Sequence, residues 1–286
     1  MPEAGSIELH VREVGSGVPL LLLHGLGADH TLWSAATGPL GDGIRVIAPD
    51  LRGHGRTPNP EGSTFAFDEL VGDLERLLDG RGLDAVHLAG SSAGGFLALR
   101  LALDHPERVR SLMLLSSAAH VDGHTRAVAQ NWAEVLRDQG YEAYVRRLLK
   151  DVYYAEWLQS HLDLVDEALE SMRGRDLRSV VQWGASLRGF DVRQRLRGLR
   201  APTLILHGMD DRVVDPSHAR LLRQAIQGAE MKLFPYAGHM LPVERPEEIG
   251  GLLRGWVLAT EAARAAPPAS PRPGGAGFST AGAPPG

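Results

Sequence analysis

Short apolar runs alternate with longer amphipathic segments along most of the chain. Six runs are almost wholly apolar, at Leu20–Leu23, Arg45–Ala48, Ala85–Ala89, Arg110–Leu115, Thr203–Leu206 and Met231–Phe234. Such runs are typical of strands that are covered on both faces. Helical spacing of apolar residues is found between them, at Asp68–Asp79, Ala93–Leu103, Pro216–Ile226 and Pro246–Thr260. This order predicts an α/β fold with a mostly parallel central sheet flanked by helices.

The N-terminal strand has a different pattern from the other six. From Ile7 to Val14 apolar and polar residues alternate, which is typical of a strand with one buried face. A glycine-rich turn at residues 15–17 follows. We therefore expect an antiparallel N-terminal strand or a hairpin.

The alternation of strands and helices stops between His120 and about Leu196. Long amphipathic segments such as Arg126–Gln139 and Tyr141–Lys150 follow one another there, which predicts a helical insertion. Eight of the chain's sixteen aromatic residues lie in it: Trp132, Tyr141, Tyr144, Tyr153, Tyr154, Trp157, Trp183 and Phe190. A lid over an apolar pocket would need such residues, but ordinary helix packing uses them too, and we favour packing for any single one.

These patterns divide the chain into four regions. We expect a core domain in two parts, residues 1–119 and 197–261, with a helical cap at residues 120–196 inserted between them. In the last region, residues 262–286, Ala, Pro and Gly occupy 19 of 25 positions. A hydrophobic core cannot be built from that composition, so we expect a disordered tail.

Composition and charge exclude several classes of function. The 286 residues include no cysteine, which rules out disulfides, thiolate metal sites and a cysteine nucleophile. The formal charge of -5, without a cluster of basic residues, argues against nucleic acid as a partner. The first ten residues do not resemble a signal peptide, and the early apolar run Val18–Leu23 is too short to span a bilayer. We expect a cytoplasmic protein with no membrane partner.

The sharpest chemical motif is the sequence GSSAG at residues 90–94. It lies directly between a predicted strand and a predicted helix, so its middle residue must adopt a strained conformation and its outer positions need very small side chains. Gly90 and Gly94 meet that need, and the hydroxyl of Ser92 is then exposed at the positive end of the helix. Ser91 is the neighbouring alternative, but Ala89 stands two residues before it, so the glycine spacing selects Ser92 as the nucleophile.

A serine nucleophile needs a base, and His239 is the best candidate among the twelve histidines. It follows the last predicted strand in the sequence AGHM, and loops at the carboxyl ends of parallel strands are where active sites of such folds concentrate. The alternative interpretation is an ordinary surface histidine. The other histidines lie in predicted strands, at helix ends or in the helical insertion.

The base in turn needs a carboxylate that orients its ring. The segment HGMDDRVVD at residues 207–215 follows another predicted strand and offers three acids, Asp210, Asp211 and Asp215. The order along the chain is then Ser, Asp, His, which is the order found in α/β-hydrolases.

From about residue 5 to residue 260 the sequence resembles the α/β-hydrolase superfamily, and within it the 3-oxoadipate enol-lactonase-like esterases and lactonases. Six segments carry the resemblance: HGLGADHTLW at 24–33, DLRGHGRT at 50–57, GSSAGG at 90–95, HPERV at 105–109, GMDDRVVD at 208–215 and GHMLPVERPEE at 238–248. Each is weak alone, but their shared order and spacing are specific. The resemblance implies an α/β-hydrolase fold with a helical cap insertion.

The resemblance also selects the acid. In the family the acid stands three residues after the glycine that ends its strand, which corresponds to Asp211. Asp210 is the nearest rival, and we expect Asp215 to cap the helix that begins at Pro216. Some relatives place the acid after the strand that follows the nucleophile's helix, but this chain has Ser116 and Ser117 there.

Acyl transfer also needs hydrogen-bond donors for the developing oxyanion. The backbone N–H of Ala93, next to the nucleophile, is one, and the resemblance implies the N–H of Leu26 as the second. The segment GLGADH imitates a dinucleotide-binding motif, but His30 replaces its third glycine, so we expect no nicotinamide cofactor. We assign the nearby polar residues His24, His54, Asp50 and Arg52 to hydrogen bonding within loops.

We expect neither a metal nor any other cofactor. The motif H-E-x-x-H is absent, and no pair of histidines at helical spacing has an accompanying acid.

These residues predict a serine hydrolase that cleaves a small-molecule ester or lactone through an acyl-enzyme on Ser92. A carbon–carbon bond hydrolase of ring-cleavage products ranks second, because such enzymes usually carry Asn before the nucleophile and Trp after the histidine, where this chain has Ser91 and Met240. A hydrolase-like receptor that senses a small molecule is a third possibility. Dehalogenases and epoxide hydrolases of the superfamily use an aspartate in place of Ser92.

The sequence leaves the substrate and the oligomeric state open. Aromatic residues in the cap favour an apolar or aromatic substrate. Four arginines there could equally face inward to hold a carboxylate, namely Arg126, Arg146, Arg147 and Arg188.

Overall fold

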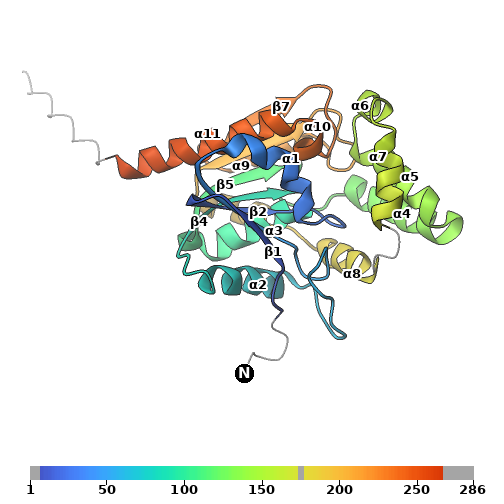
Figure 1. Ribbon diagram of the computed structural model, residues 1–286, viewed down its shortest axis with the longest axis horizontal. Helices are drawn as coiled ribbons and strands as arrows, with labels where there is room; N and C mark the ends of the chain where they lie inside the picture. Colours follow the sequence, from blue (N-terminus) through green and yellow to red (C-terminus); the bar gives the residue numbers. More distant parts are fainter. Residues whose placement is uncertain (1–6, 173–176, 267–286) are drawn as a thin grey trace, which may run out of the picture.

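A single sheet forms the centre of the protein (Figure 1). The computed structural model describes residues 7–172 and 177–266, and the sheet has seven strands within them. They are β1 Val11–Val14, β2 Gly17–Leu23, β3 Gly43–Pro49, β4 Val86–Ser91, β5 Val109–Leu115, β6 Thr203–Gly208 and β7 Glu230–Phe234. The spatial order is β1-β3-β2-β4-β5-β6-β7, and only β1 pairs antiparallel with its neighbour. The mostly parallel sheet and the six apolar strands predicted from the sequence are confirmed.

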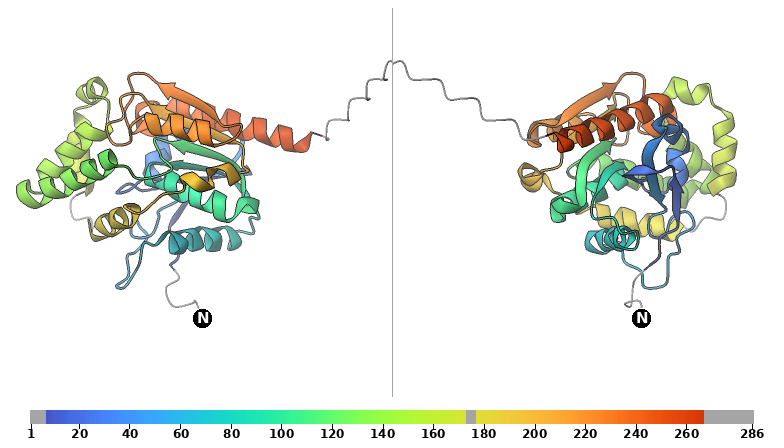
Figure 2. Two further views of the ribbon diagram at one scale, coloured as in Figure 1. Left: turned by 180° about the vertical axis from the view of Figure 1, so that it is seen from behind. Right: turned by 60° about the vertical axis from the view of Figure 1, so that its left-hand side comes forward.

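Helices cover both faces of this sheet (Figure 2). One face carries α2 Phe67–Asp79, α3 Ala93–Asp104 and α9 Ser217–Ala225, and the other carries α1 Ser34–Thr37, α10 Leu241–Glu244 and α11 Pro246–Ala265. Successive strand residues point to opposite faces. In β2, Leu21 and Leu23 pack on the first set of helices, whereas Leu20 and Leu22 pack on the second. Burial on both sides explains the continuous apolar runs.

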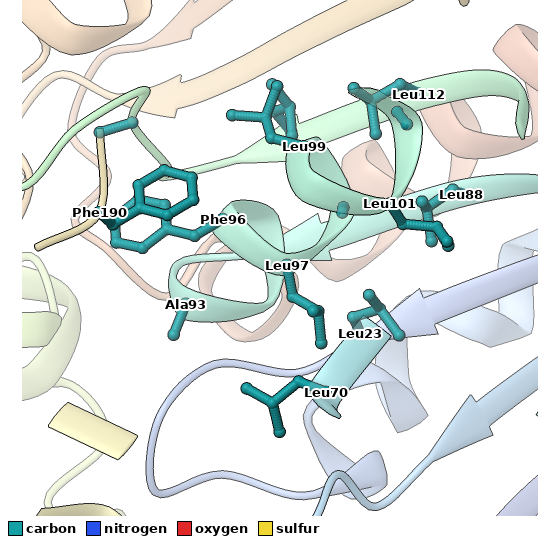
Figure 3. Close-up of a cluster of buried hydrophobic side chains, with 14 of the residues drawn as sticks. Leu23, Leu70, Leu88, Ala93, Phe96, Leu97, Leu99, Leu101, Leu112 and Phe190 are labelled. Carbon is teal, nitrogen blue, oxygen red and sulfur yellow. The ribbon is translucent and has the colours of Figure 1, made fainter. Parts of the chain in front are cut away.

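The helix α3 is buried almost all round, and it begins directly after Ser92. Figure 3 shows Phe96, Leu97 and Leu99 pointing from it in different directions into the surrounding core. The ring of Phe96 stacks on that of Phe190, with centroids 4.9 Å apart and planes 12° from parallel. Dense packing of this kind leaves little room for the helix to shift, so the residue at its start is held firmly.

The N-terminal strand is shorter than predicted and forms no hairpin with β2. Its residues pair antiparallel with β3, which lies between β1 and β2. The turn instead crosses the start of β3 so closely that a Cβ atom at Gly15 would lie 2.4 Å from the carbonyl oxygen of Ile44. Local sequence predicts a turn there, but β1 pairs with residues 46–49 of β3. The expected antiparallel N-terminal strand is therefore confirmed, and the alternative of a hairpin is wrong.

Among the described residues between β5 and β6 there are five α-helices: α4 Gly123–Gln139, α5 Tyr141–Val152, α6 Ala155–Gln159, α7 Asp163–Met172 and α8 Leu177–Leu187. Figure 1 shows them at one end of the sheet, on the right. The described residues between 120 and 196 contain no strand apart from an isolated bridge between His120 and Asp191. Four of the insertion's aromatic residues are buried, as the packing interpretation predicts: Tyr144, Tyr153, Trp183 and Phe190.

The segments that lead into and out of these helices run side by side. The N–H of Val121 donates to the carbonyl oxygen of Phe190 at 3.1 Å, and the N–H of Val192 donates to that of Ala119 at 2.8 Å. Both connections between the core and the helical insertion thus lie at one place, and the boundaries at residues 120 and 196 stay a prediction.

The C-terminal helix α11 continues to Ala265. Residues 262–265 are therefore helical where the composition predicted disorder, because alanine and arginine are good helix formers and extend an existing helix readily. Residues 267–286 of the expected tail lie outside the described residues. In the described part of the chain, no helix is both long enough and apolar enough to cross a membrane.

Candidate active site

Ser92 occupies a strained turn between β4 and α3. Its backbone torsion angles are φ 53° and ψ −120°, a region that residues with a side chain rarely adopt. A Cβ atom at Gly90 would lie 2.3 Å from the carbonyl oxygen of Gly94, and one at Gly94 would lie 2.4 Å from that of His24. Only glycine fits at both positions, which is the reason for the G-x-S-x-G spacing. Ser91, in contrast, is the last residue of β4 and is fully buried.

The ends of the parallel strands bring the candidate residues to one edge of the sheet. The N–H of Ser92 donates to the carbonyl oxygen of Leu115 at the end of β5, over 2.9 Å. The N–H of Ser116 in turn donates to that of Leu206 near the end of β6, also over 2.9 Å. The loops that carry Asp211 and His239 follow β6 and β7, the next two strands at this edge.

Asp211 and His239 form a direct pair in this edge. Nδ1 of His239 lies 2.7 Å from Oδ2 of Asp211, and both side chains are buried. The other carboxylate oxygen accepts hydrogen bonds from the N–H groups of Val213 and Val214, each at 2.9 Å. The rival acid Asp210 is exposed. The selection of Asp211 therefore agrees with the geometry.

The surroundings of Asp211 favour its ionised form. Burial alone would raise the pKa of this carboxyl, but the charge of His239 and hydrogen bonds from His207 and His239 outweigh burial and lower the pKa below its usual value. Nε2 of His207 lies 3.2 Å from Oδ2 of Asp211. An acid that stays ionised can hold a neutral imidazole with Nδ1 protonated, which leaves Nε2 free to accept a proton.

His239 is fixed between the core and the helical insertion. A Cβ atom at Gly208, the last residue of β6, would lie 2.0 Å from the carbonyl oxygen of Gly238, so the loop packs directly on the strand end. From the other side, the N–H of His239 donates to the carbonyl oxygen of Val152 at 2.8 Å. Val152 is the last residue of α5. The insertion thus contacts the loop that carries the candidate base.

Ser92 and His239, the candidate nucleophile and base, are not hydrogen bonded to each other. Among the described residues, no hydrogen bond joins the Ser92 hydroxyl to His239. Catalytic hydrogen bonds are often long or poorly aligned until substrate binds. The structure thus pairs Asp211 with His239.

The loop after β2 lies against Ser92. A Cβ atom at Gly25 would lie 3.1 Å from Cβ of Ser92 and 3.7 Å from its Oγ. Leu26 follows in this loop, and Ala93 is the first residue of α3, where backbone N–H groups have no partner within the helix. The loop that carries Leu26 therefore packs directly against Ser92, and the absence of a nicotinamide cofactor stays a prediction.

The predicted hydrogen bonding within loops is seen for His24, His54 and Asp50, whereas Arg52 reaches the helix α2. His24 is fully buried: Nε2 accepts from the N–H of Leu51 at 2.9 Å, and Nδ1 donates to the carbonyl oxygen of Gly25 at 2.8 Å. Burial lowers the pKa of His24 to about 3, so the ring is neutral. Arg52 forms a buried two-bond ion pair with Asp73.

The four cap arginines differ in their surroundings. Arg146 pairs with Glu142 on an exposed helix surface, and Arg147 pairs with Asp151. Arg126 and Arg188 line a polar hollow of about 460 Å³ where the insertion joins the core. Arg126 donates to the carbonyl oxygen of Val121 there. Because Arg146 and Arg147 are already paired with Glu142 and Asp151, we do not expect either of them to hold the carboxylate of a substrate.

In the part of the chain that the structure describes, one group of side chains has ligand atoms close enough for a metal ion. Atoms of His10, His30 and Asp50 all lie within 4.8 Å of one another. They come from three separate segments, so no spacing in the sequence could reveal them. The Asp50 carboxylate already accepts hydrogen bonds from the N–H groups of His30 and Arg56, both at 2.8 Å, which indicates a structural role in joining these loops. The absence of a metal stays a prediction.

Two comparisons with known proteins identify the family. Residues 18–246 match the family described as alpha/beta hydrolase fold. The chain is 33% identical over 252 residues to 2-hydroxy-6-oxo-2,4-heptadienoate hydrolase from Pseudomonas putida, covering 85% of this chain and 90% of that protein. The chain belongs to the α/β-hydrolase fold family. A candidate carbamate hydrolase, RutD, from Azorhizobium caulinodans is 30% identical over 90% of this chain and 98% of its own length.

Solved structures agree with this assignment. A thermophilic esterase from Thermogutta terrifontis superimposes with a TM-score of 0.80 at 27% identity, covering 89% of this chain and 94% of that one. The enol-lactonase from Burkholderia xenovorans LB400 gives a TM-score of 0.79 at 25% identity, covering 90% and 97%. The resemblance to enol-lactonase-like enzymes stated from the motifs is confirmed.

Two side chains of this α/β-hydrolase were missed from the sequence. His207 contacts Asp211 from four residues upstream, and Glu244 is buried beside the His239 loop. Glu244 lies inside the motif at 238–248 and His207 directly precedes the motif at 208–215, and a polar residue four or five positions from the candidate acid or base is a signal that could have singled them out. The contact from Val152 has no such signal, because its backbone carbonyl makes it.

Proposed function

We propose that this α/β-hydrolase cleaves a carboxylic ester or lactone, with Ser92 as nucleophile, His239 as base and Asp211 as its orienting acid. The observation that carries the proposal is the buried 2.7 Å contact of His239 Nδ1 with Asp211, at the sheet edge where the strained turn exposes Ser92. A protonated Nδ1 held by an ionised acid leaves Nε2 as the acceptor for the serine proton.

The reaction then follows from the residues in place. Nε2 of His239 takes the proton of Ser92 while Oγ attacks the carbonyl carbon, and the N–H groups of Leu26 and Ala93 stabilise the oxyanion. The imidazolium returns its proton to the leaving alcohol, which leaves an acyl group on Ser92. Water, activated by His239 in the same way, releases the acid and restores the serine.

Two observations support an ester or lactone as the substrate class. The esterase and the enol-lactonase share the fold at 27% and 25% identity over most of this chain. The residues that flank the motifs, Ser91 and Met240, are not the Asn and Trp that usually flank them in carbon–carbon hydrolases. One observation favours the second candidate activity, carbon–carbon bond hydrolysis: the chain is 33% identical to the heptadienoate hydrolase.

A substrate panel tests the proposal. Nitrophenyl esters, lactones and a ring-cleavage dienoate are assayed with the wild-type chain and with Ser92→Ala as the blank. We expect repeated turnover of esters or lactones that the variant abolishes. Faster turnover of the dienoate would support the carbon–carbon hydrolase, and a single slow turnover of every compound would support a receptor. Wild-type activity in the Ser92→Ala variant would refute the assignment of Ser92 as the nucleophile.

A further inference from the structure

Glu244 is a buried acid at the end of α10, only 5% exposed, that binds the backbone on both sides of His239. Its Oε2 accepts from the N–H of Gly238 at 2.9 Å, and its Oε1 accepts from that of Met240 at 3.2 Å. Oε2 also accepts from the N–H of Tyr154 at 3.1 Å. One carboxylate thus joins the loop of the candidate base to the segment that follows α5.

The same segment holds the loop from its other side. The carbonyl oxygen of Val152 accepts hydrogen bonds from the N–H groups of His239 and Met240, at 2.8 and 3.2 Å. A Cβ atom at Gly238 would lie 2.7 Å from the nitrogen of Tyr154, so the two backbones are in direct contact. Every backbone N–H from Gly238 to Met240 therefore has an acceptor in Glu244 or in Val152.

We infer that Glu244 is a positioning residue for His239, which fixes the imidazole between Asp211 and Ser92 by joining its loop to residues 152–154 of the helical insertion. The inference rests on the proposed function, because it assigns to Glu244 a task that matters only if His239 is the base. Within the described part of the chain Glu244 forms no hydrogen bond or ion pair with Ser92 or Asp211, so it acts through the backbone around His239.

A neutral side chain cannot replace this carboxylate. The two oxygens of Glu244 serve three N–H groups, and glutamine would offer one oxygen and turn an NH2 group toward the remaining donors. Burial raises the pKa of Glu244, while the backbone hydrogen bonds and the charge of His239 act in the opposite direction. A backbone N–H group that loses its acceptor in Glu244 would seek water instead, and the loop that carries His239 would shift. A displacement of about 1 Å can lower a rate roughly a hundredfold.

The test compares Glu244→Gln with Glu247→Gln, an exposed acid in the first turn of α11 that loses the same charge. We expect Glu244→Gln to lower kcat roughly a hundredfold while KM stays nearly unchanged, because the bound substrate keeps its contacts and the base loses its position. Glu247→Gln should match the wild-type enzyme. Wild-type kcat in a folded Glu244→Gln variant would overturn the inference.

A double-mutant cycle separates positioning from a general structural role. In the background of His239→Ala, where no base remains to be positioned, Glu244→Gln should cause little further loss of the residual rate. An equal fold-loss in both backgrounds would overturn the inference. If Glu244→Gln does not fold, Glu244→Asp enters the same cycle, since it keeps two oxygens at a shorter reach. Ser92→Ala runs alongside, and its wild-type activity would refute the proposed function separately from the role of Glu244.

Discussion

Asp210 and Asp211 are adjacent acids with different surroundings. Asp211 is buried and accepts from His239 and from two backbone N–H groups, whereas the side chain of Asp210 is exposed. Asp211→Asn would offer only one oxygen and would favour the wrong tautomer of the imidazole, so we expect kcat to fall by roughly ten-thousandfold. Asp210→Asn should remain close to wild type. Steady-state kinetics on the same ester decide, and the reverse ranking would move the role to Asp210.

His24 gives the fold a pH dependence whose sign follows from its burial. Burial lowers its pKa from 6.5 to about 3, so at intermediate pH the unfolded chain binds a proton that the folded chain does not. The stability linked to the neutral ring is complete above pH 6.5 and is lost as the pH falls toward 3. Within this range, each pH unit of acidification lowers the free energy of unfolding by about 1.4 kcal/mol.

The variant His24→Gln isolates this contribution. It should be less stable than wild type near neutral pH by about 1–3 kcal/mol, because buried hydrogen bonds to Leu51 and Gly25 are lost. On acidification below 6.5 its free energy of unfolding should fall less steeply than that of the wild-type chain. Urea unfolding at a series of pH values measures both slopes. Parallel curves would show that His24 is protonated in the folded state as well.

At the scale of elements, the geometry of the candidate active site depends on how closely the strand ends pack against the loops that carry Asp211 and His239. The end of β6 contacts the His239 loop through Gly208, where a Cβ atom would lie 2.0 Å from a backbone oxygen. The loop must move if that space is filled. The distance between Asp211 and His239 therefore depends on a residue that does no chemistry itself.

Gly208→Ala tests this dependence. We expect it to lower the free energy of unfolding by about 1–3 kcal/mol and to reduce kcat, since overpacking displaces the base. Gly251→Ala in α11 is the matched control, because nothing lies within 4 Å of the added Cβ atom and alanine favours a helix. That variant should be more stable by about 0.5–1 kcal/mol and fully active. Thermal unfolding and kinetics on both variants check the contrast, and a fully active Gly208→Ala would contradict it.

At the scale of the whole molecule, local sequence and long-range contacts decide different features. The apolar runs predicted six strands because burial on both faces leaves a continuous local pattern. The turn at Ser92 was also predictable, since Gly90 is required by its contact with Gly94 four residues later, whereas Gly94 is required by Leu23 and His24 at the distant end of β2. The place after β6 predicted an acid but offered Asp210, Asp211 and Asp215, and the resemblance to the family was needed to select Asp211.

Other features depend on residues that are distant along the chain. The insertion of β3 between β1 and β2 is set by pairing across the sheet, so the local turn suggested a hairpin that does not form. The support of the His239 loop by Val152 and Glu244 joins the insertion to the core, and backbone acceptors leave no pattern in side-chain composition. These contacts are visible only when the chain is folded.

Trapping the acyl-enzyme tests the central claim most directly. The wild-type chain and Ser92→Ala are each mixed with a nitrophenyl ester, quenched in acid and digested, and the peptides are analysed by mass spectrometry. We expect one acyl group on Ser92 of the wild-type chain, and neither label nor turnover in the variant. An acyl group on Ser91 or elsewhere, or wild-type turnover by Ser92→Ala, would contradict the account.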